Sequence, residues 1–487
     1  MITIKKYRLI AVAVMACGYL LSGCESFLEE AVYTEYDPAK LLQTEEGINS
    51  VLVSAYGELQ FKGNNREFNH TFAEFPTDIA LESGGGFERE AVLFMNFQWD
   101  ESHAFFSNSW SKMYRAIRNA NSLLDNIGLA TSLPEQRLAE LTAEARFIRA
   151  AAYFHLYDLF GPVPLITTSE TLDMEPVRPS EADFSAFLTA ELRAAADALP
   201  AVQDMIGKAT KGAALAVLCK FYLNTKQWQL SADAADELIG LGQYGLFGAI
   251  EELFTVDNET NAEFIYTHPY LPLSGFGNTY MAHAFPPNYP VLPNWENYGA
   301  QYRTYTSFVK SFEPGDRRLR MFLTEYTTIQ GQQVQLVEDE QGRPLDNARS
   351  FKYVPDPSAI NAFHGNDCPI IRYADILLSK AEALNELNGP TDDALALLND
   401  IRERAGVSLL TLDNVPTPAD FRDAVLRERG WEFFSEGLRR QDLVRHGQFI
   451  GSAIARGKAA KPHHVRYPIP RRELEANQQL TQNEGYD

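Results

Sequence analysis

Two distant segments of the chain repeat one helical pattern, and this repetition constrains the fold more than any other feature. The segments are KGAALAVLCKFYLNTKQWQLSADAADELI, residues 211–239, and ADILLSKAEALNELNGPTDDALALLNDIRERAG, residues 374–406. Apolar residues recur at three- and four-residue steps on both sides of a short turn, so each segment predicts a helical hairpin. Small and large residues alternate on the facing helices, which is typical of tetratricopeptide-like packing. Because the hairpins are irregular and far apart, we expect a globular scaffold and not an open solenoid.

Helix boundaries can be assigned at several other points of the first half. Thr44 and Ser180 each precede an apolar-periodic run and are good N-cap residues. Asp183, three residues after Ser180, completes an approximate capping box. Pro134 opens a long helix that must end at Gly161, since the proline that follows cannot continue the hydrogen-bond ladder. These signals predict a mainly α-helical protein.

The helical pattern fades in two stretches, residues 61–106 and 247–369. Pro, Gly, Asn and aromatic residues are frequent there, and short strand-like pieces such as EFIYTHPY and RSFKYV appear. Long irregular segments in a large helical protein are usually functional. We expect a single domain over residues 24–487. In it, a scaffold of helical hairpins, about 40–246 and 370–450, packs against this loop-rich portion with its short strands.

The first 23 residues have the features of an export signal. MITIKKYR carries three basic residues and no acid, and LIAVAVMACGYLL is apolar but too short to span a bilayer. The motif LSGC that follows resembles a bacterial lipobox, in which small residues admit the backbone to a signal peptidase. We therefore predict a lipoprotein signal peptide over residues 1–23. The Cys24 thiol would take a diacylglycerol, and each buried methylene of its acyl chains contributes about 0.8 kcal/mol to anchoring.

Charge and cysteine content exclude some functions. The formal net charge is −22, and removal of the basic signal peptide makes the mature chain more acidic. An acidic surface disfavours nucleic acid and acidic membranes as partners. After cleavage and acylation only Cys219 and Cys368 remain as thiols, and their spacing does not indicate a disulfide. We expect stability to come from a large core.

Several motifs, taken in order, resemble one known family. They are AEARFIRAAAYFHLYDLFGPVPLI, EPGDRRLRMF, RYADILLSKAEALNEL, LRERGWEFFSEGLRRQDLVRHGQF and YPIPRRELEANQQLTQNEGY. Together with the lipobox they are similar to the SusD/RagB family of outer-membrane nutrient-binding lipoproteins of Bacteroidetes, nearly from end to end. One departure is Arg440-Gln441, which stands where an aromatic residue is expected before Asp442, and it concerns local packing only.

The resemblance implies a fold of four tetratricopeptide-like hairpins packed against a variable portion. It also implies a function that needs neither catalysis nor a cofactor. It implies that the protein captures a glycan at the cell surface and delivers it to a SusC-like TonB-dependent outer-membrane porin, for which it acts as the lid. A peptide ligand remains an alternative. The acids after Cys24, namely Glu25, Glu29 and Glu30, resemble the export signal of surface lipoproteins, which would place the protein on the cell exterior. An ordinary solvated tether is the other interpretation.

An enzyme is the main competing interpretation. The chain has no Gly-x-Ser-x-Gly elbow, and GFGNTY lacks the third glycine of a dinucleotide-binding loop. No cysteine pair or helical His-x-x-x-His spacing indicates zinc, and no acidic loop has the ligand spacing of a calcium site. Paired carboxylates of a glycan-active hydrolase remain open, because 65 acidic residues allow many pairs. A scaffold that binds only other proteins is the third interpretation.

A site for neutral sugars needs flat aromatic rings for the C–H faces and amide or acidic side chains for the hydroxyl groups. Two irregular stretches offer this mixture, FPPNYPVLPNWENYGAQY and NFQWDESHAFF. The expected ligand-binding residues are Trp295, Asn294, Tyr298, Tyr289, Trp99 and Asp100. Alternatively, Trp295 only fills its own loop and Trp99 only packs beneath the next helix.

Overall fold

The computed structural model describes residues 41–59, 71–170, 175–299 and 301–486. The expected signal peptide, Cys24 and the acids after it lie outside these residues. The described part is mainly α-helical with a few short strands, as the sequence predicts. None of its helices combines the length and the hydropathy needed to cross a membrane.

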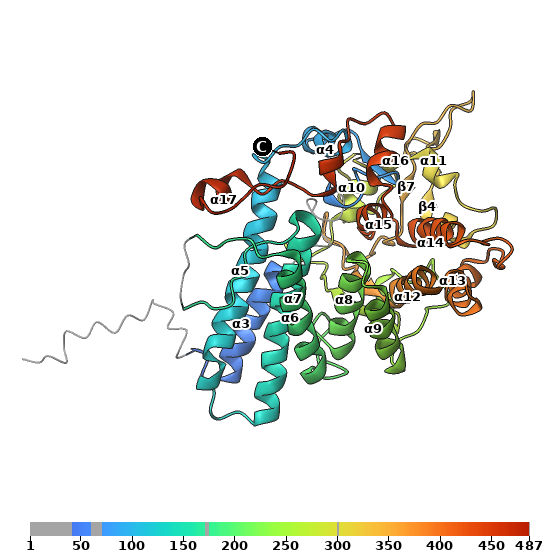
Figure 1. The fold of residues 1–487 in the computed structure, drawn as a ribbon. Coiled ribbons are helices and arrows are strands. Elements are labelled where there is room, and N and C mark those ends of the chain that lie inside the picture. Colours follow the sequence, from blue (N-terminus) through green and yellow to red (C-terminus); the bar gives the residue numbers. More distant parts are fainter. Residues whose placement is uncertain (1–40, 60–70, 171–174, 300, 487) are drawn as a thin grey trace, which may run out of the picture.

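Nine helices of the described chain form the scaffold, and neighbours in the array pack side by side (Figure 1). They are α3 (Glu45–Glu58), α5 (Ala104–Asn126), α6 (Glu135–Phe160), α7 (Glu181–Ala198), α8 (Lys211–Asn224), α9 (Trp228–Gly240), α12 (Tyr373–Asn388), α13 (Asp392–Ala405) and α14 (Pro418–Phe433). The two similar segments form the hairpins α8–α9 and α12–α13. Because α9 packs on α12, the two hairpins are adjacent in space although far apart in sequence.

Hydroxyl side chains begin these helices where the sequence predicts it. The Thr44 and Ser180 hydroxyls accept the backbone N–H groups of Gly47 and Asp183, both at 3.1 Å. Thr210, Thr391 and Thr417 cap α8, α13 and α14 in the same way. Pro134 precedes α6, and Gly161 ends it with φ +74°, a conformation that favours glycine. The predicted boundaries of α3, α6 and α7 are therefore confirmed.

The loop-rich portion contains small elements only. Its helices are α4 (Glu88–Met95), α10 (Tyr280–Ala284), α11 (Thr306–Val309), η4 (Val256–Asn258) and η5 (Arg317–Met321). Its strands form two-stranded antiparallel sheets: β1 (Ala80–Glu82) with β3 (Tyr302–Thr304), β2 (Phe264–His268) with β8 (Cys368–Arg372), β4 (Phe322–Leu323) with β7 (Arg349–Ser350), and β5 (Glu325–Thr327) with β6 (Gln333–Gln335). EFIYTHPY and RSFKYV do contain strands, β2 and β7.

One part of this portion is more regular than the sequence analysis expects. Residues 88–95, inside the stretch expected to be irregular, form α4. Ala91, Phe94 and Met95 are buried on one side of it, at helical spacing. The glycine run before α4 and the many phenylalanines obscure this short period.

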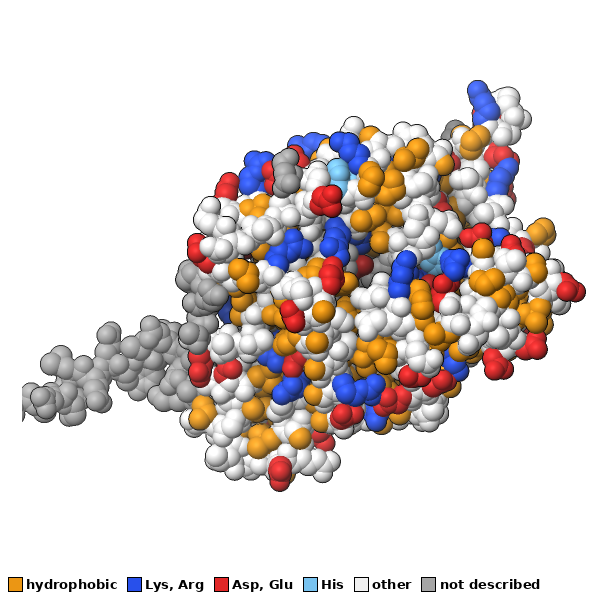
Figure 2. Space-filling model, viewed as in Figure 1, with side chains coloured by type: hydrophobic (Ala, Val, Ile, Leu, Met, Phe, Trp, Pro, Cys, Tyr) orange, Lys and Arg blue, Asp and Glu red, His pale blue; other side chains and the backbone are white. Residues whose placement is uncertain are grey.

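The chain after α14 returns across the scaffold. Its elements are α15 (Arg439–Arg445), α16 (Phe449–Ala455), η6 (Pro462–Val465) and α17 (Arg471–Ala476). Far earlier in the chain, a single turn η3 (Ile127–Leu129) follows α5. Figure 1 shows these C-terminal segments, in red, at the upper ends of the scaffold helices. On the face shown in Figure 2, acidic and basic side chains are interspersed between apolar ones.

Three large apolar cores account for most of the buried side chains. One lies among α3 and α5–α9 and includes C-terminal residues such as Tyr467, one lies within the loop-rich portion, and one lies among α12–α14. Cys219 and Cys368 are both buried free thiols, in separate cores. Among the described residues no disulfide therefore contributes to stability.

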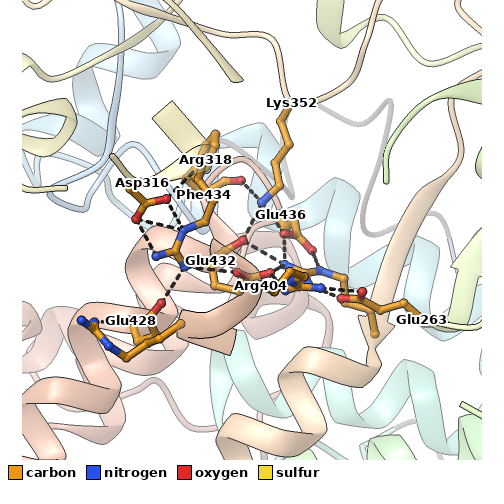
Figure 3. A network of polar contacts seen from close by, with 11 residues as sticks. Glu263, Asp316, Arg318, Lys352, Arg404, Glu428, Glu432, Phe434 and Glu436 are labelled. Atoms are coloured by element: carbon orange, nitrogen blue, oxygen red, sulfur yellow. Dashed lines mark hydrogen bonds and ion pairs between the residues drawn. The ribbon is translucent and has the colours of Figure 1, made fainter. Parts of the chain in front are cut away.

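A buried cluster of opposite charges, here called the ionic seam, joins the loop-rich portion to α13 and α14 (Figure 3). Its cations are Arg318, Lys352, Arg372, Arg402 and Arg404, and its carboxylates are Glu263, Asp316, Glu428, Glu432 and Glu436. Cations and carboxylates are equal in number, so the seam is neutral as a whole. Such pairing is what allows charges to remain buried, because an unpaired one would cost several kcal/mol.

Glu432 lies at the centre of the seam. Burial alone would raise the pKa of its carboxyl, but Arg404, Arg372 and Arg318 hold that pKa well below its usual range. Arg404 and Arg372 reach its carboxylate at 2.5 and 2.7 Å. Lys352 donates to the backbone carbonyl of the same residue at 2.7 Å. The segments that carry Arg318, Lys352 and Arg372 are thus fixed to α14, the last helix of the scaffold.

Candidate functional site

The loop over residues 285–299 follows α10 and contains the predicted ligand residue Trp295. Four prolines interrupt it, at positions 286, 287, 290 and 293. A proline ring fixes φ and removes a backbone donor, so this segment cannot continue the helix or join a central strand. The loop is therefore irregular in conformation but restricted in freedom.

Three aromatic rings of this loop lie nearly parallel. The rings of Tyr289 and Trp295 are each 5.5 Å from the ring of Phe285, at interplanar angles of 12° and 10°. Phe285 is completely buried, whereas Tyr289 and Trp295 are half-buried and so reach the surface. Tyr298 lies beyond them with 39% of its surface exposed, and its ring is 4.8 Å from that of His283. We call Tyr289, Asn294, Trp295 and Tyr298 the aromatic platform.

Hydrogen bonds to a second loop hold the aromatic platform in position. The indole N–H of Trp295 donates to the backbone carbonyl of Asp356 at 2.9 Å. The side-chain amide of Asn294 donates to the carbonyls of Pro357 and Ala359, at 3.0 and 2.8 Å. These bonds fix both side chains from a loop about sixty residues further along the chain. Trp295 therefore packs against its surroundings and still has part of its ring at the surface.

His364 supports the aromatic platform from beneath. It is buried, its Nδ1 accepts the backbone N–H of Asp356 at 3.0 Å, and its ring lies 5.7 Å from that of Trp295. Burial lowers the pKa of His364 to about 4, against the opposing effect of Asp356. The histidine is thus neutral at physiological pH, and the support under the platform carries no positive charge there.

The second predicted stretch packs elsewhere. Trp99 is only 5% exposed and lies in the core of α3 and α5–α9, where its ring contacts Phe94, His464 and Tyr467. Its indole N–H donates to the Tyr486 hydroxyl at 2.9 Å. A ring enclosed in this way has no face left for a sugar, so Trp99 is a core residue. We do not include it in the ligand site.

Asp100 is exposed, but its carboxylate serves the local turn. It accepts the backbone N–H of Ser102 at 2.8 Å and also the Ser102 hydroxyl. These bonds keep the pKa of Asp100 below its usual value, against the opposing effect of partial burial. Because Trp99 packs into the scaffold core and Trp295 against the core of the loop-rich portion, the two stretches do not form one cluster.

The aromatic platform offers stacking surfaces and amide groups. Within the described ranges no group of three or more His, Cys, Asp or Glu side chains could hold a metal ion. The arrangement suits reversible binding of a ligand with flat apolar faces and hydroxyl edges. Phe285, Asp356 and His364 are not among the residues predicted from the sequence. Only Phe285, at the start of the stretch FPPNYPVLPNWENYGAQY, has a local signal.

Comparison with known proteins places this chain in a family. Residues 224–486 match the model described as the SusD family, and residues 26–223 match a model described as "Starch-binding associating with outer membrane". SusD-like protein P25 of Formosa agariphila is 26% identical and is aligned over 95% of this chain and 97% of its own. Starch-binding protein SusD of Bacteroides thetaiotaomicron is 24% identical over 88% and 87% of the two chains.

Solved structures share the fold. A laminarin-binding SusD-like protein superposes with a TM-score of 0.77 at 25% identity and covers 91% of this chain and 100% of its own. A SusD homologue from Bacteroides thetaiotaomicron superposes with a TM-score of 0.80 at 22% identity, over 92% and 98% of the two chains, and shows the same fold. Since the SusD model covers more than half of the sequence and the fold is shared over nine tenths of it, the chain belongs to the SusD family.

Proposed function

We propose that this protein captures an oligosaccharide at the cell surface, on the aromatic platform, and passes it to a SusC-like TonB-dependent outer-membrane transporter as its lid. The observation that carries the proposal is the row of parallel rings on a proline-restricted loop. Membership of the SusD family supports it, as do relatives whose names describe them as binding starch and laminarin. No catalytic step is part of this function.

The chemistry of the platform supports a sugar ligand. Pyranose rings have apolar C–H faces that stack on aromatic rings, and their hydroxyl groups need donors and acceptors such as the Asn294 carbonyl oxygen. The prolines and the bonds to residues 356–359 restrict the loop before binding, so less conformational entropy is lost when a ligand binds. One stacked ring contributes about 1–3 kcal/mol, by analogy with base stacking on aromatic side chains.

The N-terminal motif supports the proposed location. Acylation at Cys24 would hold the mature chain on the outer membrane, and the acids after it would direct it to the exterior. A lipid anchor leaves the folded portion free to tilt over a neighbouring transporter. The protein would then present its ligand directly above the pore.

Binding is tested on the mature soluble chain with an array of neutral and acidic oligosaccharides and a matched peptide panel. Trp295→Ala should lose detectable binding of the identified oligosaccharide at the aromatic platform while its helical circular dichroism stays unchanged. Trp228→Ala, which removes a half-buried tryptophan from α9, is the matched control and should bind normally. Unchanged affinity in Trp295→Ala would exclude the platform, and binding of peptides alone would replace the sugar by a peptide ligand.

The transporter partnership needs its own experiment. Affinity purification of the natively expressed protein from detergent-solubilised outer membranes should recover a TonB-dependent transporter in near-equal amounts. Recovery of periplasmic proteins alone would contradict a lid function. Product released from a bound oligosaccharide at a rate proportional to protein concentration would instead indicate a hydrolase.

A further inference from the structure

A cavity of about 700 Å³ lies where α6 and α8 end beneath α15 and the C-terminal segment. Figure 2 shows the surface hollowed near the middle of this face, between the upper ends of the scaffold helices. Its walls include Phe154, Tyr157, Asn224, Gln441, His463 and Arg466. The volume lies within the usual range for small-molecule sites, about 300–1,000 Å³.

The cavity is separate from the aromatic platform. Phe154, Tyr157 and Val444 pack against the core of α3 and α5–α9, whereas Tyr289 and Trp295 pack against the core of the loop-rich portion. No residue that lines the cavity belongs to the platform. A ligand in the cavity would therefore be a second ligand, or a second segment of a long one.

Most charged groups on the cavity walls form ion pairs with neighbouring residues of opposite charge. The pairs are Arg445 with Glu382 at 2.6 Å, Arg466 with Glu181 at 2.5 Å, and Arg440 with the wall residue Asp158 at 3.4 Å. Only Glu484, which is exposed, has no such partner among the described residues. A wall with its charges already compensated does not favour a strongly charged ligand. It favours an uncharged polar one.

The uncharged wall residues suit hydroxyl groups and apolar ring faces. Tyr157 is held rigidly, since its ring stacks on Phe184 at 5.3 Å and 22° and its hydroxyl donates to Glu181. The amides of Asn224 and Gln441 meet only at 3.5 Å, a long hydrogen bond. Within the described chain the Gln441 amide nitrogen has no acceptor at all, so it is free to donate to a ligand.

The last residues of the described chain form a fixed wall. Gly485 has φ +86°, and a Cβ there would lie 2.4 Å from Nδ1 of His463, so only glycine allows this close approach. The next residue, Tyr486, donates its hydroxyl to the Arg466 carbonyl at 2.9 Å and places its ring 4.6 Å from that of His463. The wall is therefore preorganised, which reduces the entropy lost on binding.

From these observations we propose that the cavity is a second carbohydrate subsite, which binds a short segment of a neutral oligosaccharide. The inference rests on the proposed function, because it assumes that glycans reach this protein. Two separate subsites on one chain would raise the avidity for a long polysaccharide without any change in the contacts at either.

Hydrogen exchange on the mature protein tests the inference and locates the ligand. The probes are maltotriose, laminaritriose and xylotriose, with trigalacturonate as the charged comparison. A neutral trisaccharide should slow exchange in residues 462–466 and 483–486 by about threefold or more, in the parent and in Trp295→Ala alike. Residues 286–299 should be protected in the parent and not in Trp295→Ala. This second signal reports separately on ligand binding at the platform.

Variants of the cavity wall provide the affinity test. Gln441→Ala should weaken binding at the cavity by at least about fivefold, and Val444→Trp, which fills the cavity, should abolish the protection. Gln448→Ala, an exposed glutamine close by that does not line the cavity, is the matched control and should change nothing. Protection unaffected by Val444→Trp would overturn the inference. So would protection by trigalacturonate alone, or no protection of these segments by any neutral trisaccharide.

If residues 286–299 are protected neither in the parent nor in Trp295→Ala, and the cavity segments are protected in both, the platform is refuted and the cavity subsite stands. The opposite pattern would refute the cavity subsite and leave the proposed function intact. The two conclusions can therefore fail independently.

Discussion

The ammonium group of Lys220 on α8 lies 2.9 Å from the carboxylate of Asp375 on α12, and both side chains are fully buried. These are the first helices of the two hairpins that resemble each other in sequence. Arg429 on α14 reaches the same carboxylate oxygen at 2.8 Å. The Asp375 carboxylate thus connects three helices of the scaffold. It joins α8, in the core of α3 and α5–α9, to α12 and α14, in the core of α12–α14.

Removing the lysine from this group should be strongly destabilising. The group continues through Asp442, Arg445 and Glu382, so that three cations face three carboxylates. Lys220→Met leaves this network with one carboxylate in excess, and breaking a buried pair typically costs about 3–5 kcal/mol. The double variant Lys220→Met/Asp375→Asn restores neutrality and should unfold at a higher denaturant concentration than Lys220→Met alone. Urea denaturation of the four proteins of this double-mutant cycle measures the coupling. A cycle with additive effects would show that the pair contributes no interaction energy.

Asp367 gives a prediction about pH. Burial first, and Glu259 second, raise the pKa of its carboxyl from the model-compound value of 3.8 to about 8. Between these two values the folded protein keeps a proton that the unfolded chain has released. The free energy of unfolding contributed by this group therefore decreases as the pH rises from about 4 to about 8.

Asp367→Asn should remove this dependence, since the amide stays neutral and its oxygen can still accept the backbone N–H of Tyr270. Its thermal midpoint should match that of the parent near pH 4 and exceed it increasingly toward pH 8, by the equivalent of more than about 1 kcal/mol. Thermal melts across this range provide the measurement, with the exposed Asp413→Asn as control. A constant difference at all pH values would contradict the assigned ionisation.

Tyr298 is the most exposed ring of the aromatic platform, so its removal should affect ligand affinity more than folding. Tyr298→Ala should weaken oligosaccharide binding by about tenfold, the equivalent of about 1.4 kcal/mol. Its thermal midpoint should stay close to that of the parent, because little buried area is lost. Tyr298→Phe retains the stacking face and should retain most of the affinity. Equal losses in both variants would point to the hydroxyl group instead of the ring.

Membrane anchoring should depend on one atom, the Cys24 sulfur. Cys24→Ala should release the protein from outer-membrane fractions and abolish labelling with a radioactive fatty acid. Cys17→Ala, seven residues earlier in the apolar run, is the matched control and should be acylated normally. A Cys24→Ala protein that still incorporates fatty acid would show that another residue is the anchor.

The predictable parts of the fold were those encoded by neighbouring residues. Thr44 and Ser180 indicated where helices begin, and the caps in the structure confirm both. In contrast, α14 lies inside the scaffold predicted over residues 370–450, but its boundaries are not assigned from the sequence, because Glu428 and Glu432 occupy its buried side and disturb the apolar period. Such charges are buried only because cations arrive from distant loops, and a sequence does not reveal that pairing.

The candidate site shows the same limit. The proline-rich loop and its aromatic residues could be recognised in the sequence, but the support from Asp356 and His364 comes from about sixty residues further along the chain. Trp99 and Trp295 have similar polar and aromatic neighbours in sequence, and they differ in the structure. The Tyr486 hydroxyl and the C-terminal segment enclose Trp99, which no local pattern indicates.

The ionic seam has a consequence for how such a protein can diversify. Its cations Arg318, Lys352 and Arg372 mark fixed points within the loop-rich portion, and each is fastened to α14 or to the residues just after it. Segments between these points can lengthen, shorten or change composition while the loop-rich portion stays fixed to the scaffold, because longer surface loops cost little entropy. Selection for a new ligand could therefore remodel the intervening loops while the anchoring residues and the closed core are inherited unchanged.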